Sequence, residues 1–392
     1  MSVTPQPRST PARRYDLDWL RSAVVLMLIP YHTSRLFDTW EPFYVKNAQT
    51  SVALSGARAF LDPWGMPLLF VIAGSATWLA LRRRTGIQYL RERLLRLTIP
   101  LLFGLVVIVP PQAYLGWLGQ GNDGTYWGFL TQYWTMGTGE IMGWTGGFTL
   151  GHLWFILFLF LFSLLALPIF LFLKGQTGRR AIRWLAGLFQ KPGFIFLFVV
   201  PLWLTEPLPG PIVGLLNPFS YILLFIVGFV LFADDRFQTG LDSSWQWALG
   251  LGTITLVAVA AFRFSGIQFA ELSWQSSLRD FLRFFTTWAW VVGALGFAHR
   301  HLNRPSRLLG YLNSAAYPFY VLHQTVILAI GFMVIRWNIS VFAKFLIIAA
   351  AATGSTLALY ELARRWAVTR TLLGIKGPAP RASRGQRTPT TR

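Results

Sequence analysis

The chain has 392 residues, of which 54% are hydrophobic and only 13% charged, a balance outside the usual range of soluble domains. It contains no cysteine, so disulfides, thiolate metal sites and a catalytic thiol are excluded. The net charge of +20 does not indicate nucleic-acid binding, because the basic residues stand between apolar runs and in the tails rather than along one soluble face.

Ten apolar runs predict an all-α polytopic membrane protein, because a helix needs about 20 mainly apolar residues to cross a bilayer. The fifth run is the shortest, and at 1.5 Å per residue it gives a helix of only about 18 Å, which predicts a short or broken span. We expect all ten helices to form one bundle. The runs are residues 17–37, 57–81, 94–118, 152–173, 193–204, 212–232, 245–262, 278–298, 311–335 and 341–362.

The basic residues predict how this bundle is oriented, because Lys and Arg accumulate on the cytoplasmic side of a membrane. With ten crossings and a cytoplasmic N-terminus, the segments that hold most of the Lys and Arg all face the cytoplasm. The long segment 119–151 holds neither Lys nor Arg and should face the outside. The basic segments are residues 82–93, 174–192, 299–310 and 363–392.

The chain therefore divides into a membrane domain between two tails. Residues 1–14 have no apolar run and are expected to form a cytoplasmic tail rather than a removable signal peptide. Residues 15–366 should form the transmembrane domain. Residues 367–392 are rich in Arg, Pro and Thr and should form a disordered cytoplasmic tail. This organisation predicts a multi-pass protein of the inner (plasma) membrane.

Ionisable residues within the first span indicate function, because each is costly in lipid. Arg21 and His32 are eleven residues apart, or about 1100° of helical rotation, so they share one face of the helix, about 16 Å apart along its axis. A neutral imidazole can accept a proton from a hydroxyl, which makes His32 a candidate general base. The alternative is a histidine that only packs and hydrogen-bonds.

Asp62, near the outer end of the second span, should lie at the depth of His32. A carboxylate there could orient the imidazole and stabilise the imidazolium, as the third member of a triad does. Alternatively, Asp62 only caps the helix that begins at Pro63.

Arg93 and Arg96 lie one turn apart at the cytoplasmic start of the third span. Free backbone N–H groups, the helix dipole and two guanidinium groups favour an anion there, which would suit the phosphates of coenzyme A. The same residues are also explained as ordinary cytoplasmic charge.

Further candidates for binding substrate are His152 and Trp154, at the start of the fourth span, and His323, in the middle of the ninth. The two histidines could instead form structural hydrogen bonds. No set of His and carboxylate residues has the spacing of metal ligands, so we expect no metal. The outer segment between the third and fourth spans is rich in aromatic residues, which could form platforms for sugar rings or an interfacial belt. These aromatic residues are Tyr114, Trp117, Tyr126, Trp127, Tyr133, Trp134 and Trp144.

Five motifs together resemble the acyltransferase-3 family over about residues 15–335. They are LDWLR with ten residues between Arg21 and His32, MPLLFVIAG in the second span, Arg93 and Arg96, HLWFILFLF at His152, and YPFYVLHQ at His323. HLWF and FYVLHQ are more similar to the branch that contains a periplasmic-glucan succinyltransferase than to the O-antigen acetyltransferases.

The resemblance implies a ten-helix bundle that transfers acyl groups from cytoplasmic acyl-CoA to a glycan hydroxyl on the outer side. It also implies that His32 is catalytic, that Arg21 is its partner, and that Arg93 and Arg96 lie near the donor. One departure is that Ala73 stands where the family usually has serine, so a role for that serine does not carry over.

Two other classes of function fit the same composition. A transporter or flippase of glycan, lipid or a small solute could use His32 and Arg21 as a proton or substrate path. A non-catalytic membrane partner of an envelope assembly complex would need neither residue. An acyltransferase is expected to interact with the bilayer, acyl-CoA and a carbohydrate acceptor, and not with nucleic acid.

Overall fold

The computed structural model describes residues 13–40, 42–135, 144–191, 193–208, 217–270 and 273–375, and throughout these ranges the regular elements are helices. In chain order they are α1 (Tyr15–Ser34), α2 (Val52–Leu61), α3 (Gly65–Leu81), α4 (Gly86–Phe103), η1 (Gly104–Ile108), α5 (Val109–Gly119), α6 (Tyr126–Tyr133), η2 (Gly151–Leu153), α7 (Trp154–Leu165), α8 (Leu167–Lys174), α9 (Gln176–Phe189), η3 (Phe194–Phe198), α10 (Val199–Trp203), α11 (Pro218–Leu231), α12 (Arg236–Ser265), α13 (Trp274–His301), α14 (Arg307–Val334), α15 (Val341–Ala363) and α16 (Ala367–Leu372). The prediction of an all-α protein is confirmed.

Six helical segments in the described part of the chain are long and apolar enough to cross a membrane, and α7 with α8, bent by 48°, can form a seventh. Two apolar helices are shorter. One consists of η3 and α10 together, and the other is α11. The protein is therefore a multi-pass membrane protein. Each of the ten predicted ranges overlaps a helix of the structure, including α1, and the number of crossings stays a prediction. The six are Val52–Leu81, Gly86–Gly119, Arg236–Ser265, Trp274–His301, Arg307–Val334 and Val341–Ala363.

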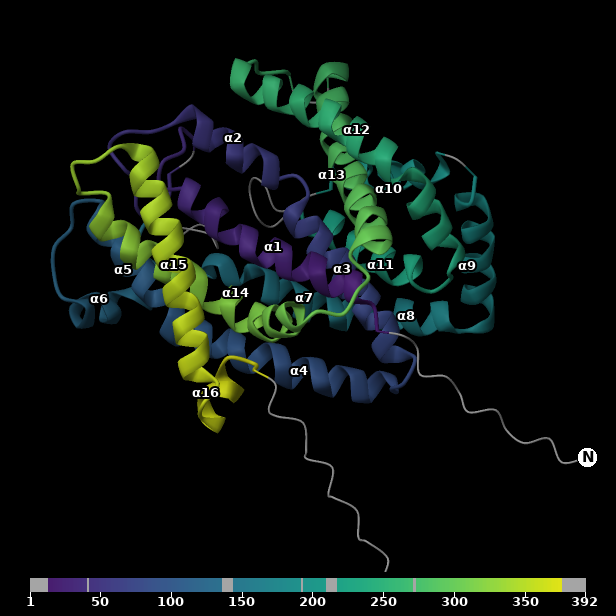
Figure 1. The fold of residues 1–392 in the computed structure, drawn as a ribbon, viewed down its shortest axis with the longest axis horizontal. Coiled ribbons are helices and arrows are strands. Elements are labelled where there is room, and N and C mark those ends of the chain that lie inside the picture. The colour runs from purple at the N-terminus through teal and green to yellow at the C-terminus, as the bar shows by residue number, and fades with distance from the viewer. Residues whose placement is uncertain are drawn as a thin grey trace, which may run out of the picture.

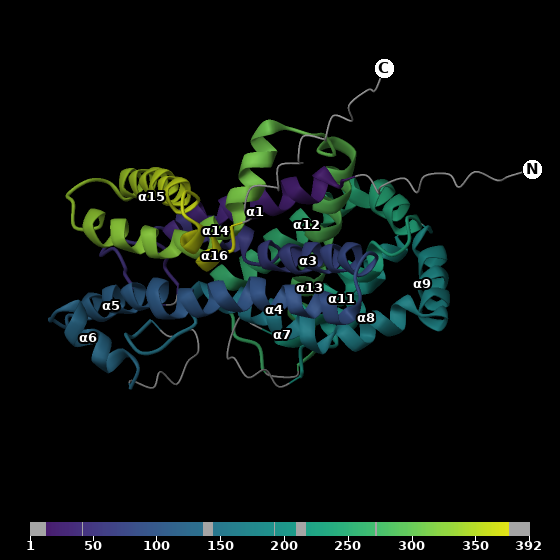
Figure 2. The same ribbon diagram turned by 90° about the horizontal axis from the view of Figure 1, so that it is seen from below.

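Helix α1 runs through the middle of the bundle. Helices α5, α6 and α15 lie at one end of the long axis and α8 and α9 at the other (Figure 1). Turned by 90°, α4 and α5 form a continuous layer beneath α1 and α14 (Figure 2). The first helix therefore has neighbours on several sides, namely α2, α3, α13, α14 and α15.

Two close helix pairs position the centre of the molecule. Helices α3 and α11 cross at Gly74 and Gly228, where the absence of side chains lets the backbones meet. A Cβ atom at Gly74 would collide with the carbonyl oxygen of Phe225, and one at Gly228 with that of Val71. Either glycine replaced by alanine would force these helices apart.

The second pair is α1 with α14, which run parallel. Near the start of each helix, Arg21 donates a hydrogen bond to the side-chain oxygen of Asn313. Further along both helices, the rings of His32 and His323 lie 5.1 Å apart. Because the two contacts are ten or eleven residues apart on each helix, the helices keep their register over about 16 Å.

The two tails are described only in part. Residues 1–12 lie outside the described residues. Of the segment expected to be disordered, Ala367–Leu372 forms the short helix α16, which packs against α4, and residues 376–392 lie outside the described part of the chain.

Candidate active site

A cavity of about 230 Å³ lies beside the C-terminal half of α1. Its wall is mostly apolar and aromatic, with a few polar side chains converging on it, as in most small-molecule sites. Two of the predicted substrate-binding residues, His152 and Trp154, belong to this wall. Its polar and aromatic lining includes Tyr31, His32, Arg35, Asp62, His152, Trp154, Tyr320 and Gln324.

Three histidines from different parts of the sequence meet at this cavity. The ring of His323 lies 5.1 Å from that of His32 and 5.1 Å from that of His152. They come from α14, α1 and η2, so packing alone brings them together. His323 is completely buried and is not part of the cavity wall. Within the described ranges, no three His, Asp or Glu side chains are placed to hold a metal ion.

His152 makes hydrogen bonds through both ring nitrogens. Its Nε2 atom lies 2.9 Å from the carbonyl oxygen of Val321, and its Nδ1 atom lies 3.3 Å from the side-chain nitrogen of Gln112. Since the carbonyl can only accept, Nε2 carries the proton and Nδ1 accepts from Gln112. The hydroxyl of Tyr320 donates to the carbonyl oxygen of His152. His152 is therefore held firmly, with its tautomer fixed.

Glutamines extend this polar network and were not found from the sequence. Gln112 donates to the hydroxyl of Thr325 at 2.7 Å, and Gln324 donates to Gln112 at 3.0 Å. Gln324 lines the cavity. The available signal was a polar residue next to His323 in the middle of a predicted span, a position where polar groups are usually functional.

The structure does not pair Asp62 with His32, the residue that Asp62 was predicted to orient. One oxygen of Asp62 accepts a hydrogen bond from the hydroxyl of Tyr31 at 2.6 Å, and the other lies 3.2 Å from Nε of Arg58. Successive helix residues point about 100° apart, so the side of α1 that faces Asp62 presents Tyr31 rather than His32. Asp62 nevertheless shares the cavity wall with His32.

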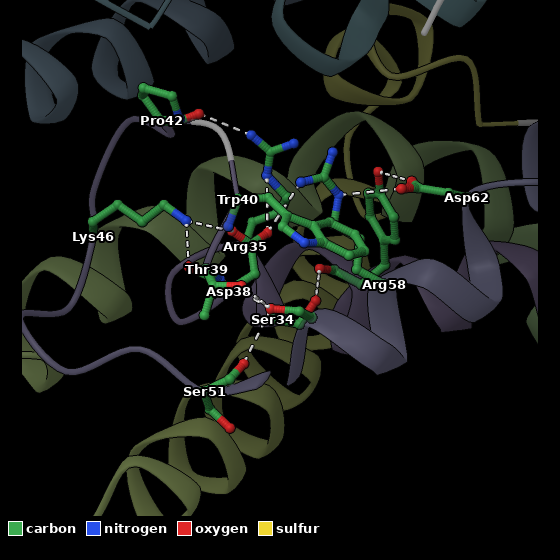
Figure 3. A network of polar contacts seen from close by, with 12 residues as sticks. Ser34, Arg35, Asp38, Thr39, Trp40, Pro42, Lys46, Ser51, Arg58 and Asp62 are labelled. Atoms are coloured by element: carbon green, nitrogen blue, oxygen red, sulfur yellow. Dashed lines mark hydrogen bonds and ion pairs between the residues drawn. The ribbon is translucent and has the colours of Figure 1, made fainter. Parts of the chain in front are cut away.

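Asp62 belongs to a buried ion network at the C-terminal end of α1 (Figure 3). At its centre is Asp38, whose side chain is completely buried and pairs with Lys46, with Arg58 at 3.2 Å and with Arg35 at 3.7 Å. Arg58 is also completely buried and connects Asp38 to Asp62. Burial lowers the pKa of Lys46, while its hydrogen bond to Asp38 acts in the opposite direction.

Aromatic rings cover the arginines of this network. The guanidinium group of Arg35 lies 4.7 Å from the ring centre of Phe43 and 5.3 Å from that of Trp144. Its Nη2 atom donates to the carbonyl oxygen of Pro42 at 2.9 Å. Cation–π contacts of this kind hold a cation and two flat rings in one arrangement. Phe43 and Trp144 both line the cavity.

Of the aromatic residues predicted as sugar platforms, only Trp144 lines this cavity. Tyr114, Trp117 and Tyr126 instead pack around Phe129 in a separate cluster. Trp127 and Trp134 are exposed. The aromatic segment therefore contributes one ring to the candidate site.

Arg93 and Arg96, which were predicted near the donor, come together with Arg21 at the opposite end of α1. Arg21 lies 2.7 Å from Asp18, and Arg93 donates to the hydroxyl of Thr77 at 3.2 Å. Arg96 is exposed and close enough to Arg93 and Arg21 for electrostatic interaction.

Helix α14 completes this arginine cluster, which consists of Arg21, Arg93 and Arg96. Asn313 accepts from Arg21, and the hydroxyl of Tyr317 donates to the carbonyl oxygen of Arg96 at 3.4 Å. Neither residue was singled out from the sequence, because their relation to the arginines depends on how α14 packs.

Comparison with known proteins shows the family. The family model for the acyltransferase domain matches residues 14–361, so the chain belongs to this family of acyltransferases, and the resemblance seen in its motifs is confirmed. The chain is also similar to proteins called glucans biosynthesis protein C from Salmonella typhimurium strain LT2, Salmonella schwarzengrund and Salmonella heidelberg. Each is 24% identical over 98% of this chain and 99% of the relative. No solved structure matches the chain significantly.

Proposed function

We propose that this membrane acyltransferase transfers an acyl group from acyl-CoA to a carbohydrate hydroxyl on the outer side of the inner membrane. The observation that carries the proposal is the geometry of α1. One face of this helix bears His32 in the cavity wall and, about 16 Å away, Arg21 in the arginine cluster. The name of the Salmonella relatives refers to glucan biosynthesis, which supports a glucan-like acceptor.

The arginine cluster is our proposed site for the phosphates of the donor. Charge-assisted hydrogen bonds from guanidinium groups to phosphate are strong and selective. In the proposed ten-helix topology this cluster faces the cytoplasm, where acyl-CoA is made. The phosphates stay there, and the thin pantetheine arm extends along α1 toward His32, past Val24, Met27 and Leu28 of the cavity wall. The acyl thioester then reaches the cavity without the charged end of the donor crossing the membrane.

The cavity is our proposed site for the acceptor. Trp144, Phe43 and Trp154 offer flat apolar faces against which a sugar ring can pack, and Asp62 offers a carboxylate that accepts hydrogen bonds from hydroxyl groups. His152, held by its fixed hydrogen bonds, forms part of the same wall. This combination of rings and one carboxylate suits a neutral sugar.

The proposed reaction is direct transfer with His32 as general base. Nε2 of His32 takes the proton of the acceptor hydroxyl as its oxygen forms a bond to the thioester carbonyl carbon. The resulting tetrahedral intermediate collapses, the carbon–sulfur bond breaks, and His32 gives the proton to the departing thiolate. The products are an ester and free coenzyme A, and neither a metal nor an acyl-enzyme is used.

Substitution of His32 tests this function. We expect His32→Ala to lower acyl transfer by about 10²- to 10⁴-fold, the usual contribution of a general base, while the protein still folds. Mass spectrometry of envelope glycans from cells with and without the protein identifies the acyl group, and the same measurement is applied to the variant. His301→Ala is the matched control, because His301 is exposed at the far end of α13. Normal glycan acylation by His32→Ala would remove His32 from the mechanism.

Thiol labelling tests the proposed sidedness, and the chain has no cysteine to interfere. Thr50, between α1 and α2, and Arg83, between α3 and α4, are both exposed. With a membrane-impermeant reagent, Thr50→Cys should label only from outside and Arg83→Cys only from the cytoplasm. The reverse pattern would place the cavity on the cytoplasmic side and contradict transfer across the membrane.

A further inference from the structure

Two ring nitrogens in the histidine group have no hydrogen-bond partner among the residues that the structure describes. They are Nδ1 of His32 and Nε2 of His323, and both are buried. Buried polar atoms are nearly always hydrogen-bonded, so a pair of unpartnered atoms on adjacent rings requires an explanation.

The spacing of the two rings fits a bond between these atoms. Their centres are 5.1 Å apart and their planes are tilted by 49°. Two imidazoles joined by an N–H···N bond of about 2.9 Å have ring centres about 5 Å apart. A turn of the His32 ring about its χ2 angle, which is a soft torsion for histidine, can therefore bring its Nδ1 atom toward Nε2 of His323.

The backbone determines which of the two rings accepts. Nδ1 of His323 lies 2.7 Å from the carbonyl oxygen of Tyr320. Because a carbonyl can only accept, Nδ1 of His323 carries the hydrogen, and in the neutral ring Nε2 is a bare lone pair. His323 can then accept a hydrogen bond from His32 but cannot donate one through that atom.

Two other polar residues that line the cavity with His32 already have partners. His152 uses both ring nitrogens, on Val321 and Gln112. Asp62 is engaged with Tyr31 and Arg58. His323 combines a ring 5.1 Å from that of His32 with a buried nitrogen that has no partner among the described residues, so it is the group best placed to accept from Nδ1 of His32.

We propose that His323 is the positioning residue for His32: it accepts the Nδ1 hydrogen of His32 and thereby leaves Nε2 of His32 as the base in the cavity. In many hydrolases a carboxylate has this task. Here a histidine outside the cavity wall performs it, so His323 does not touch substrate. When His32 takes the hydroxyl proton, the same hydrogen bond stabilises the imidazolium until the proton passes to the thiolate. This inference rests on the proposed role of His32.

A matched pair of substitutions tests the proposal. The amide of glutamine reaches about as far as Nε2 of histidine, whereas the amide of asparagine reaches only as far as Nδ1. We expect His323→Asn to lower kcat by about 10- to 100-fold, the effect of losing a hydrogen bond to a charged group, with the KM of donor and acceptor unchanged. His323→Gln should recover most of the loss. Rates are measured on purified protein, with the glycan and acyl-CoA identified by mass spectrometry.

A double variant separates positioning from a general effect on packing. If His323 acts only through His32, His32→Ala with His323→Asn should be no slower than His32→Ala alone. Thermal unfolding of each variant in detergent checks the fold. Wild-type kcat in His323→Asn, equal losses in the two His323 variants, or a further loss in the double variant would each overturn the proposal. Wild-type activity in His32→Ala would instead overturn the proposed function itself.

Discussion

At the C-terminal end of α1, Arg58 is completely buried between the carboxylates of Asp38 and Asp62, whereas at the N-terminal end Arg96 is exposed and near two further arginines. The first arrangement pairs each buried charge within the protein. The second concentrates like charges, which repel one another unless an anion is present. The comparison indicates that the ion network is a scaffold for the cavity, and that the arginine cluster is available to a ligand.

The largest effect that this comparison predicts is on stability, at Arg58. Replacing it with methionine removes the cation that Asp38 and Asp62 share. Asp38 keeps Lys46 and Arg35, but the largely buried carboxylate of Asp62 loses the guanidinium group that pairs with it. Breaking a buried ion pair in this way usually costs about 3–5 kcal/mol. We therefore expect Arg58→Met to lower the unfolding free energy by about that amount, measured by denaturant or thermal unfolding in detergent.

The matched control for Arg58 is another arginine paired with a carboxylate, but on the surface. Arg84 lies 2.7 Å from Glu92, and both side chains are largely exposed. Exposed pairs contribute roughly 0–1 kcal/mol, so Arg84→Met should change stability little. If the two substitutions lowered the unfolding free energy equally, the buried ion network would stabilise the protein no more than an exposed ion pair does.

A smaller effect, on donor binding and not on stability, is expected at Arg96. Loss of a charge-assisted hydrogen bond to phosphate costs about 1.5–3 kcal/mol, or roughly 10- to 150-fold in affinity. We expect Arg96→Met to raise the KM for acyl-CoA by such a factor while the KM for the glycan stays the same. Arg91→Met, an exposed arginine on the same helix, is the control. An unchanged KM for acyl-CoA would show that Arg96 does not bind the donor and serves only as a cytoplasmic charge that orients the protein in the membrane.

The sequence determined where the helices form and which residues share a face of one helix, because both depend on local geometry alone. The apolar runs predicted helices wherever the structure has its long ones, and the fixed rotation per residue placed Arg21 and His32 on one face of α1. The positions of Arg93 and Arg96 within one turn followed in the same way. These relations hold within one helix and do not depend on its neighbours.

Relations between helices were decided by the tertiary structure. Matching the depths of Asp62 and His32 led to a pairing that the structure does not contain, because depth says nothing about the rotation of one helix against another. That rotation turns Tyr31 toward Asp62 and His32 toward His323. It also brings Asn313 within hydrogen-bonding distance of Arg21. The packing of side chains across helix interfaces sets this rotation, and residues almost 300 positions apart contribute to it.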